Sequence, residues 1–322
     1  MTKLLNLIIV VLALALIAVI VYPQIQANRP RLVRFACDST TSSLPILVGI
    51  EESLFINNRI TPELVWYSDP DQALADLFAG KSDVGIFPWS TVLKRIAYSG
   101  ESLKVFMSQE FRQTLPVDAI VVPAKSKLTT LADLRKKRLG YPPQLRDYVR
   151  PMLANINIRP QDITAIEVPL STLVEQLVTG SIDAAWLLEP VLCALDTVAF
   201  RTLQPGVLAR YVSAPFPGAA VGFTPGFYAK SDKVLLSRLK IATDAAVALT
   251  EGNVDKAKMV LGKYFPYCKE FCQTCRLPEM QRLVEINRPA VAALSARLAA
   301  SGVLSSEVET QNLFVEPARL TR

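Results

Sequence analysis

Residues 73–86 have the sequence ALADLFAGKSDVGI, and residues 173–186 have the sequence LVEQLVTGSIDAAW. In both, apolar residues at helical spacing are followed by a glycine, a polar turn with an aspartate, and a short apolar run. This order predicts an amphipathic helix that ends at Gly80 or Gly180, and then a buried strand. The repetition of this unit indicates two α/β lobes of similar construction.

Strand and helix signals alternate on both sides of these two stretches. Short apolar runs predict strands at Val33–Cys37, Ile60–Tyr67, Val84–Phe87, Leu103–Met107, Ala119–Val122, Arg138–Tyr141, Ile163–Val168 and Ala184–Leu187. Helical periodicity predicts helices at Asp71–Ala79, Trp89–Tyr98, Leu131–Lys136, Leu145–Asn155, Ser171–Val178, Ser231–Thr250, Val254–Tyr264 and Pro278–Ala300. Repeated β-α units imply mainly parallel sheets with helices on both faces.

The N-terminal residues form a separate segment. From Leu4 to Tyr22 the only strongly polar side chain is Asn6, and about 19 helical residues span about 28 Å, close to the hydrocarbon thickness of a bilayer. We therefore expect residues 4–22 to enter the membrane, as a retained anchor or as a cleaved signal. The arginines that follow favour a cytoplasmic body by the positive-inside rule, but an early signal-like segment can export a long domain regardless of them.

The composition argues against several classes of protein. A net charge of +6 without a block of lysine, arginine and aromatic residues gives little support to nucleic-acid binding. The chain contains no histidine, which removes the commonest general base, nucleophile partner and metal ligand. We therefore expect no catalytic residue, no metal ligand and no cofactor.

Four segments, in this order and spacing, resemble the solute-binding proteins of ABC importers. They are PILVGIEESLF at residues 45–55, GKSDVG at 80–85, LADLRKKRLG at 131–140, and GSIDAAW from 180 through Glu189-Pro190. The subgroup that the chain resembles most serves alkyl sulfonates, taurine, nitrate and thiamine-pyrimidine precursors. The resemblance covers residues 32–250 and implies a two-lobed type II periplasmic-binding-protein fold that closes on a small ligand.

The resemblance also implies an organisation and a location. After the transmembrane or signal helix within residues 1–28, we expect lobe 1 at 32–122, lobe 2 at 123–218, and a return to lobe 1 at 219–322. Since the relatives work outside the cytoplasmic membrane, the body is expected in the periplasm or on the outer face of that membrane, as a monomer anchored by residues 4–22.

Ligands of open α/β sheets bind beyond the carboxyl ends of the strands. Hydroxyl and backbone N–H groups at residues 39–43 precede a helix and suit an anionic group, although a simple N-cap explains them as well. In relatives the loop that contains Arg146 binds ligand, and Arg146 would pair with a carboxylate or sulfonate, whereas Glu189 would accept from an amine or ring N–H. The predicted ligand-binding residues are Ser39, Thr40, Thr41, Ser42, Trp89, Ser90, Gln144, Arg146 and Glu189.

The five cysteines divide into two groups. Cys37 and Cys193 lie in a predicted strand and helix, where lone cysteines are usually buried hydrophobes. The C-x3-C-x2-C cluster of Cys268, Cys272 and Cys275 favours a disulfide within the cluster, with free thiols or a metal site as alternatives. A metal would need a fourth ligand such as Glu270 or Glu279.

We expect a binding protein that captures a small anionic or heterocyclic organic ligand and delivers it to an ABC permease. One alternative is a ligand-sensing module for a membrane signalling partner. Another is an enzyme related to yeast-type thiamine-pyrimidine synthases, which share this fold. Those enzymes consume an active-site histidine, so a chain without histidine does not fit their chemistry.

Overall fold

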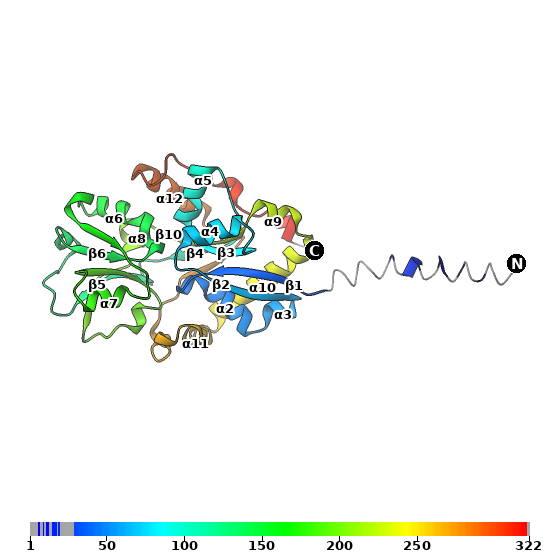
Figure 1. Cartoon of the computed structure of the whole chain (residues 1–322), viewed down its shortest axis with the longest axis horizontal. Coiled ribbons are helices and arrows are strands. Elements are labelled where there is room, and N and C mark those ends of the chain that lie inside the picture. The colour runs from blue at the N-terminus through cyan, green and yellow to red at the C-terminus, as the bar shows by residue number, and fades with distance from the viewer. Residues whose placement is uncertain are drawn as a thin grey trace.

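The computed structural model describes residues 29–320 and scattered positions between residues 6 and 19. Two sheets lie next to each other along the long axis of the molecule (Figure 1). The six-stranded sheet has the order β11-β4-β10-β3-β1-β2, and the five-stranded sheet has the order β7-β6-β8-β5-β9. The predicted two-lobed α/β class is therefore confirmed, with one sheet at the centre of each lobe.

The first sheet contains β1 (Arg31–Cys37), β2 (Ile60–Trp66), β3 (Val84–Pro88), β4 (Lys104–Phe111), β10 (Phe216–Phe223) and β11 (Glu279–Arg282). Its α-helices are α2 (Leu44–Glu51), α3 (Leu54–Asn57), α4 (Pro70–Phe78), α5 (Trp89–Ser99), α9 (Pro225–Lys230), α10 (Lys233–Gly252), α11 (Val254–Tyr264), α12 (Arg288–Ala300) and α13 (Pro317–Leu320). Helices α5 and α12 lie on one side of this sheet, and α2 and α3 lie on the other (Figure 1). Both faces of the sheet are thus covered.

The second sheet contains β5 (Asp118–Pro123), β6 (Arg138–Tyr141), β7 (Thr164–Glu167), β8 (Ala184–Leu188) and β9 (Phe200–Pro205). The helices α6 (Val149–Asn155), α7 (Leu173–Val178) and α8 (Val207–Tyr211) accompany it. Short 3-10 turns complete the chain: η1 (Thr41–Ser43), η2 (Leu131–Leu134), η3 (Pro143–Tyr148), η4 (Pro160–Asp162), η5 (Leu192–Ala194), η6 (Pro266–Cys268), η7 (Cys272–Thr274) and η8 (Gln311–Leu313).

The two repeated sequence stretches form matching structures. Gly80 and Gly180 follow α4 and α7 with φ of +74° and +71°, a conformation that glycine adopts without a steric cost. Asp83 then accepts hydrogen bonds from the backbone N–H and the guanidinium of Arg34, at the adjacent strand β1. Asp183 holds Arg138 of β6 with the same three bonds. Each polar turn therefore fixes its helix–strand unit to the neighbouring strand.

The expectation of mainly parallel sheets is wrong. β1 pairs in parallel with β2 and β3, and β6 with β7 and β8. However, β10 is antiparallel to β3 and β4, β11 is antiparallel to β4, and β5 is antiparallel to β8 and β9. Of these antiparallel strands, β10 has a weak sequence signal because it contains proline and glycine, which strands usually disfavour. Gly222 is needed there, since a Cβ would lie 2.7 Å from the carbonyl oxygen of Lys104.

Several predicted helices also differ from the structure. The stretch Pro278–Ala300 contains β11 before α12, and Leu131–Lys136 forms only the short turn η2. Residues from Leu145 begin in η3 and become helical at α6. The chain passes between the sheets after β4 and returns after β9, so β5, which the sequence prediction placed at the end of lobe 1, belongs to the second sheet.

Within the described part of the chain, no helix combines the length and apolar character needed to span a bilayer. The membrane segment predicted at residues 4–22 lies largely outside the described residues.

Candidate ligand-binding site

A narrow pocket lies where the two lobes meet, beyond the ends of β1, β3 and β8. Lobe 1 contributes Asp38, Thr40, Thr41, Ser42 and Phe87, and lobe 2 contributes Gln144, Leu145, Tyr148, Leu188 and Glu189. The cavity has a volume of about 30 Å³. A single water needs about 10–15 Å³ by this measure. An organic ligand can therefore enter only when the lobes move apart.

The backbone N–H groups of the loop after β1 donate hydrogen bonds to protein oxygens. The Asp38 carboxylate oxygen Oδ1 accepts from the backbone N–H and the hydroxyl of Thr40, at 3.1 and 2.8 Å. The N–H groups of Ser42 and Ser43 donate to Thr40. The N–H of Thr41 donates across the cleft to the carbonyl oxygen of Glu189 at 3.1 Å. These N–H groups were expected to hold an anion, but in this conformation each already has a protein acceptor.

Glu189 follows β8 and is almost completely buried, with an exposed fraction of 4%. Its carboxylate accepts from the backbone N–H of Cys193 at 2.9 Å and from that of Arg276 at 3.2 Å. Burial nevertheless raises the pKa of Glu189 to about 7, because those two bonds only partly offset the loss of hydration. Glu189 lies in the pocket lining, and its predicted role in ligand binding stays a prediction.

Glu189→Gln tests this buried carboxyl. Between the ordinary glutamate pKa of 4.5 and about 7, the folded protein binds more protons than the unfolded chain, so the stability of the parent falls as pH rises through this window. Relative to the parent, the variant should therefore gain about 3 kcal/mol of unfolding free energy between pH 4.5 and pH 8. Denaturant unfolding at the two pH values measures the difference. Arg276 and Lys258 are the charged groups that act on Glu189.

The matched control for this experiment is Glu307→Gln, because Glu307 is exposed. Its stability relative to the parent should not change between the two pH values. An equally flat profile for Glu189→Gln would contradict the raised pKa.

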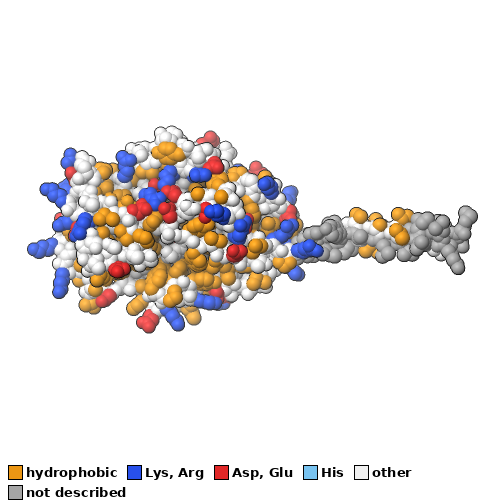
Figure 2. Space-filling model, in the orientation of Figure 1, with side chains coloured by type: hydrophobic (Ala, Val, Ile, Leu, Met, Phe, Trp, Pro, Cys, Tyr) orange, Lys and Arg blue, Asp and Glu red, His pale blue; other side chains and the backbone are white. Residues whose placement is uncertain are grey.

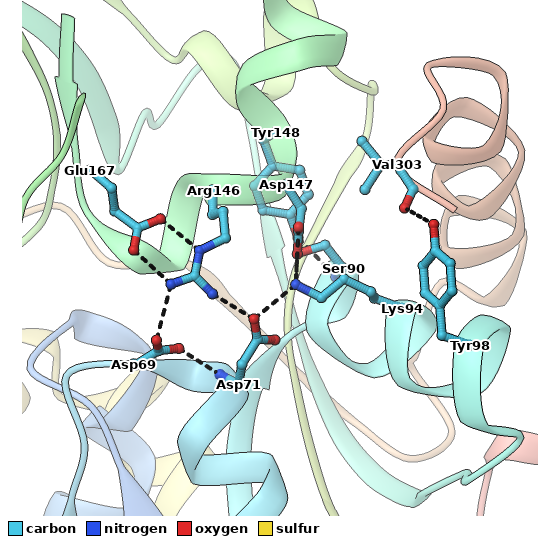
Figure 3. Close-up of polar contacts among 10 residues, drawn as sticks. All are labelled: Asp69, Asp71, Ser90, Lys94, Tyr98, Arg146, Asp147, Tyr148, Glu167 and Val303. Atoms are coloured by element: carbon cyan, nitrogen blue, oxygen red, sulfur yellow. Dashed lines mark hydrogen bonds and ion pairs between the residues drawn. The ribbon is translucent and has the colours of Figure 1, made fainter. Parts of the chain in front are cut away.

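Ion pairs join the lobes beside the pocket (Figure 3). The Arg146 guanidinium on η3 binds Glu167 of its own lobe and bonds to Asp71 and Asp69 of lobe 1 at 2.5 and 3.0 Å. Lys94 of α5 donates to Asp71 at 2.9 Å and to Asp147 of lobe 2 at 3.1 Å. Figure 2 shows acidic and basic side chains interleaved over the middle of this face.

The charges in this cluster stabilise one another. The hydrogen bonds that Arg146 donates to the Glu167 carboxylate are the main reason that the pKa of Arg146 is raised. Burial alone would lower the pKa of Lys94, but Asp147 and Asp71 outweigh it and the pKa is raised. Arg146, which was expected to pair with a ligand, is therefore bound by three protein carboxylates in this conformation.

The structure separates the predicted site residues into two sets. Thr40, Thr41, Ser42, Gln144 and Glu189 line the pocket together. The predicted residues outside this lining are Ser39, Trp89, Ser90 and Arg146. Ser39 lies in an adjacent groove with Tyr267.

Trp89 and Ser90 lie behind the pocket wall. The Trp89 ring is fully buried, and its indole N–H donates to the Ser108 hydroxyl at 2.9 Å, so it packs in the core of lobe 1. The backbone N–H of Ser90 donates to the Tyr148 hydroxyl across the lobe junction (Figure 3).

Sequence reasoning missed Asp38 and Tyr148. Asp38 directly follows a buried strand, a position where a functional acid is common, and this signal was available. Tyr148 had no such signal, because only the tertiary fold carries η3 against α5.

The cysteine pairing differs from the prediction. Cys193 of η5 and Cys275 form a disulfide across 82 residues of sequence, so a disulfide within the C-x3-C-x2-C cluster is wrong. Cys268 and Cys272 are free and buried, and Cys37 is buried in β1 as predicted. Cys193 follows β8 of lobe 2, and Cys275 precedes β11 of lobe 1. The disulfide therefore links the two lobes.

Solved structures of binding proteins share this fold. One is the alkanesulfonate-binding protein SsuA from Xanthomonas axonopodis pv. citri bound to MOPS, with a TM-score of 0.70, 19% identity, and coverage of 87% of this chain and 96% of that one. Another is the periplasmic aliphatic sulphonate binding protein SsuA from Escherichia coli, with a TM-score of 0.69, 17% identity, and coverage of 91% and 100%. The periplasmic nitrate-binding protein NrtA from Synechocystis PCC 6803 matches with a TM-score of 0.60, 12% identity, and coverage of 72% and 66%.

No curated protein matches the chain by sequence. A family model described as NMT1/THI5 like matches residues 40–208, which include Thr40 to Ser43 after β1 and all five strands of the second sheet. This range is more than half of the 322 residues. The two-lobed fold and the pocket at the strand ends agree with the resemblance found in the sequence. The chain belongs to the NMT1/THI5-like family and has the fold of the solute-binding proteins of ABC importers.

Proposed function

We propose that this protein is an extracytoplasmic solute-binding protein that captures a small organic ligand between its two lobes and delivers it to an ABC permease. The observation that carries the proposal is the pocket to which both lobes contribute polar side chains, with Thr41 on one side and Glu189 on the other. Ion pairs beside this pocket also span the two lobes, so opening and closing change both the access to the pocket and the electrostatic contacts.

The proposed location is the periplasm or the outer face of the cytoplasmic membrane, with residues 4–22 as the anchor and a monomeric body. The relatives named periplasmic support this location. N-terminal sequencing that starts near Asn28, or recovery of the protein in the soluble fraction, would contradict the anchor.

The function is tested by the small molecules that the purified protein carries. Thr41→Trp places a large ring in the pocket lining and should abolish ligand binding. The variant should then release none of the small molecule that the parent releases on denaturation. Mass spectrometry of the released fraction measures the amount per protein. Thr179→Trp, at an exposed position after α7, is the matched control and should carry as much ligand as the parent.

The sequence predicts an anionic or heterocyclic organic ligand. A thermal-shift panel of sulfonates, carboxylates, nitrate and pyrimidines tests this expectation. A compound that stabilises the parent and the Thr179→Trp control, but not the Thr41→Trp variant, would support binding in the pocket. If the parent carries no small molecule and no compound stabilises it, the proposed function fails.

A further inference from the structure

We infer that the pocket selects a ligand whose head is an organic cation, an ammonium or amidinium group, joined to a compact apolar body. This inference rests on the proposed function and names the ligand class. It departs from the anionic ligand expected from the sequence. Three observations support it: acceptors in the pocket lining, the absence of a cation there, and apolar walls.

Oxygen acceptors enter the pocket lining from three elements. Asp38 lies after β1, Glu189 after β8, and Gln144 on η3. The hydrogen bonds that reach the Asp38 side chain from the described residues all end on Oδ1, so Oδ2 can accept from a ligand. The Gln144 oxygen Oε1 is buried without a partner among the described residues, while its Nε2 donates to the Ser68 carbonyl at 3.2 Å.

Glu189 provides the second carboxyl group. Each of its oxygens accepts one backbone N–H, which leaves further acceptor capacity on both. A buried acceptor such as Gln144 Oε1 costs free energy unless a donor reaches it. An ammonium group carries three donors and no acceptor, so it complements these oxygens.

No positive charge balances these carboxyl groups within the pocket. The lining residues, all of them in the described part of the chain, include neither lysine nor arginine. Arg146 and Lys94 lie on elements beside the pocket, and protein carboxylates bind both of them. Arg276 and Lys258 also act on Glu189; both lie outside the pocket lining, although Arg276 and Glu189 together line a second groove.

The backbone N–H groups of the loop after β1 do not offset the negative charge of the two carboxyl groups either. The N–H groups of Thr40, Thr41, Ser42 and Ser43 all donate to protein oxygens. A sulfonate or nitrate in this pocket would meet two carboxyl groups, a lining without lysine or arginine, and N–H groups of Thr40 to Ser43 that already donate to protein oxygens. Burial raises the pKa of both Asp38 and Glu189. In their ionised form these carboxyl groups repel an anion, whereas a bound cation favours that ionised form.

The remaining walls are apolar. Side chains from both lobes form them, and they include Phe87, Phe111, Leu145, Leu188, Leu208 and Phe216. These walls favour a hydrocarbon body behind the charged head, and aromatic faces also attract cations. A hydrated inorganic cation fits this lining less well than an alkylammonium ion.

The test uses two probes that share one body and differ in the charge of the head: butylamine and butane-1-sulfonate. Isothermal titration of the parent should give a dissociation constant at least about 10-fold lower for butylamine, the value of one charge-assisted hydrogen bond. Glu189→Gln should weaken butylamine binding by about 10-fold or more and should not weaken sulfonate binding. The exposed Glu307→Gln variant is the matched control and should bind both probes as the parent does.

The outcomes separate this inference from the proposed function. Tighter binding of the sulfonate, blocked by Thr41→Trp, would overturn the cationic class and leave the binding function intact. Butylamine binding that is equal in the parent and in Glu189→Gln would also overturn it, provided that Asp38→Asn is equally without effect. If neither probe binds and the purified protein carries no small molecule, both the inference and the function fail.

Discussion

Cys193→Ser is expected to lower the free energy of unfolding by about 4 kcal/mol under oxidising conditions. The disulfide between Cys193 and Cys275 closes a loop of 82 residues, and the loss of chain entropy in the unfolded state for a loop of this length is worth about 4.5 kcal/mol. Denaturant unfolding followed by circular dichroism measures the change. The parent in a thiol reductant should unfold at the same denaturant concentration as the variant.

A double-mutant cycle tests whether Cys275 is the cysteine that bonds to Cys193. Cys275→Ser should cause the same loss, and the double variant should lose no more than either single variant, because one bond cannot be removed twice. Cys268→Ser should keep the disulfide, although Cys268 lies within 4.8 Å of the two bonded sulfurs. A loss of about 4 kcal/mol in Cys268→Ser, but not in Cys193→Ser, would show that the pairing is wrong.

Arg146→Ala is expected to move the lobes toward an open arrangement by about 2 kcal/mol. In the parent, Arg146 bonds to Asp69 and Asp71 of the opposite lobe, and its removal leaves these carboxylates facing Glu167. Charged hydrogen bonds are worth about 1.5–3 kcal/mol each, and the lower end applies here because the side chains are about one-third exposed to solvent. A change of about 2 kcal/mol alters the ratio of closed to open molecules about 30-fold.

Small-angle X-ray scattering measures this shift as an increase in the radius of gyration. Arg159→Ala is the matched control, since Arg159 pairs with Asp162 three residues away in the same lobe. It should leave the radius of gyration unchanged. An equal expansion in both variants, or none in Arg146→Ala, would contradict the role of Arg146 as a contact between the lobes.

The elements that could be predicted from the sequence are those with local causes. The repeated helix–glycine–aspartate–strand units were found because helical spacing, a positive-φ glycine and an apolar run all lie within 14 residues. By contrast, β10 was missed, since its proline and glycines disfavour a strand and only its neighbours β3 and β4 hold it in place. Non-local pairing of this kind leaves no periodic signal in one chain.

For the site too, only the residues whose position has a local cause could be predicted from the sequence. Thr40 to Ser42 and Glu189 follow strands, and they reach the pocket for that reason. Trp89 also follows a strand, but it is the first residue of α5 and its ring is directed into the core. The contacts of Arg146 and the partner of Cys193 depend on how the lobes meet, which spacing along the chain does not encode.

Closure of the lobes on a ligand is the central claim, and scattering before and after ligand removal tests it most directly. The purified protein is freed of its small molecule by partial unfolding and dialysis, and the released fraction is then added back. In the parent, the radius of gyration should rise on removal of the molecule and fall on its addition, whereas in Thr41→Trp it should stay constant. A radius of gyration that does not change in the parent, although the molecule binds again, would show that the lobes do not close on the ligand.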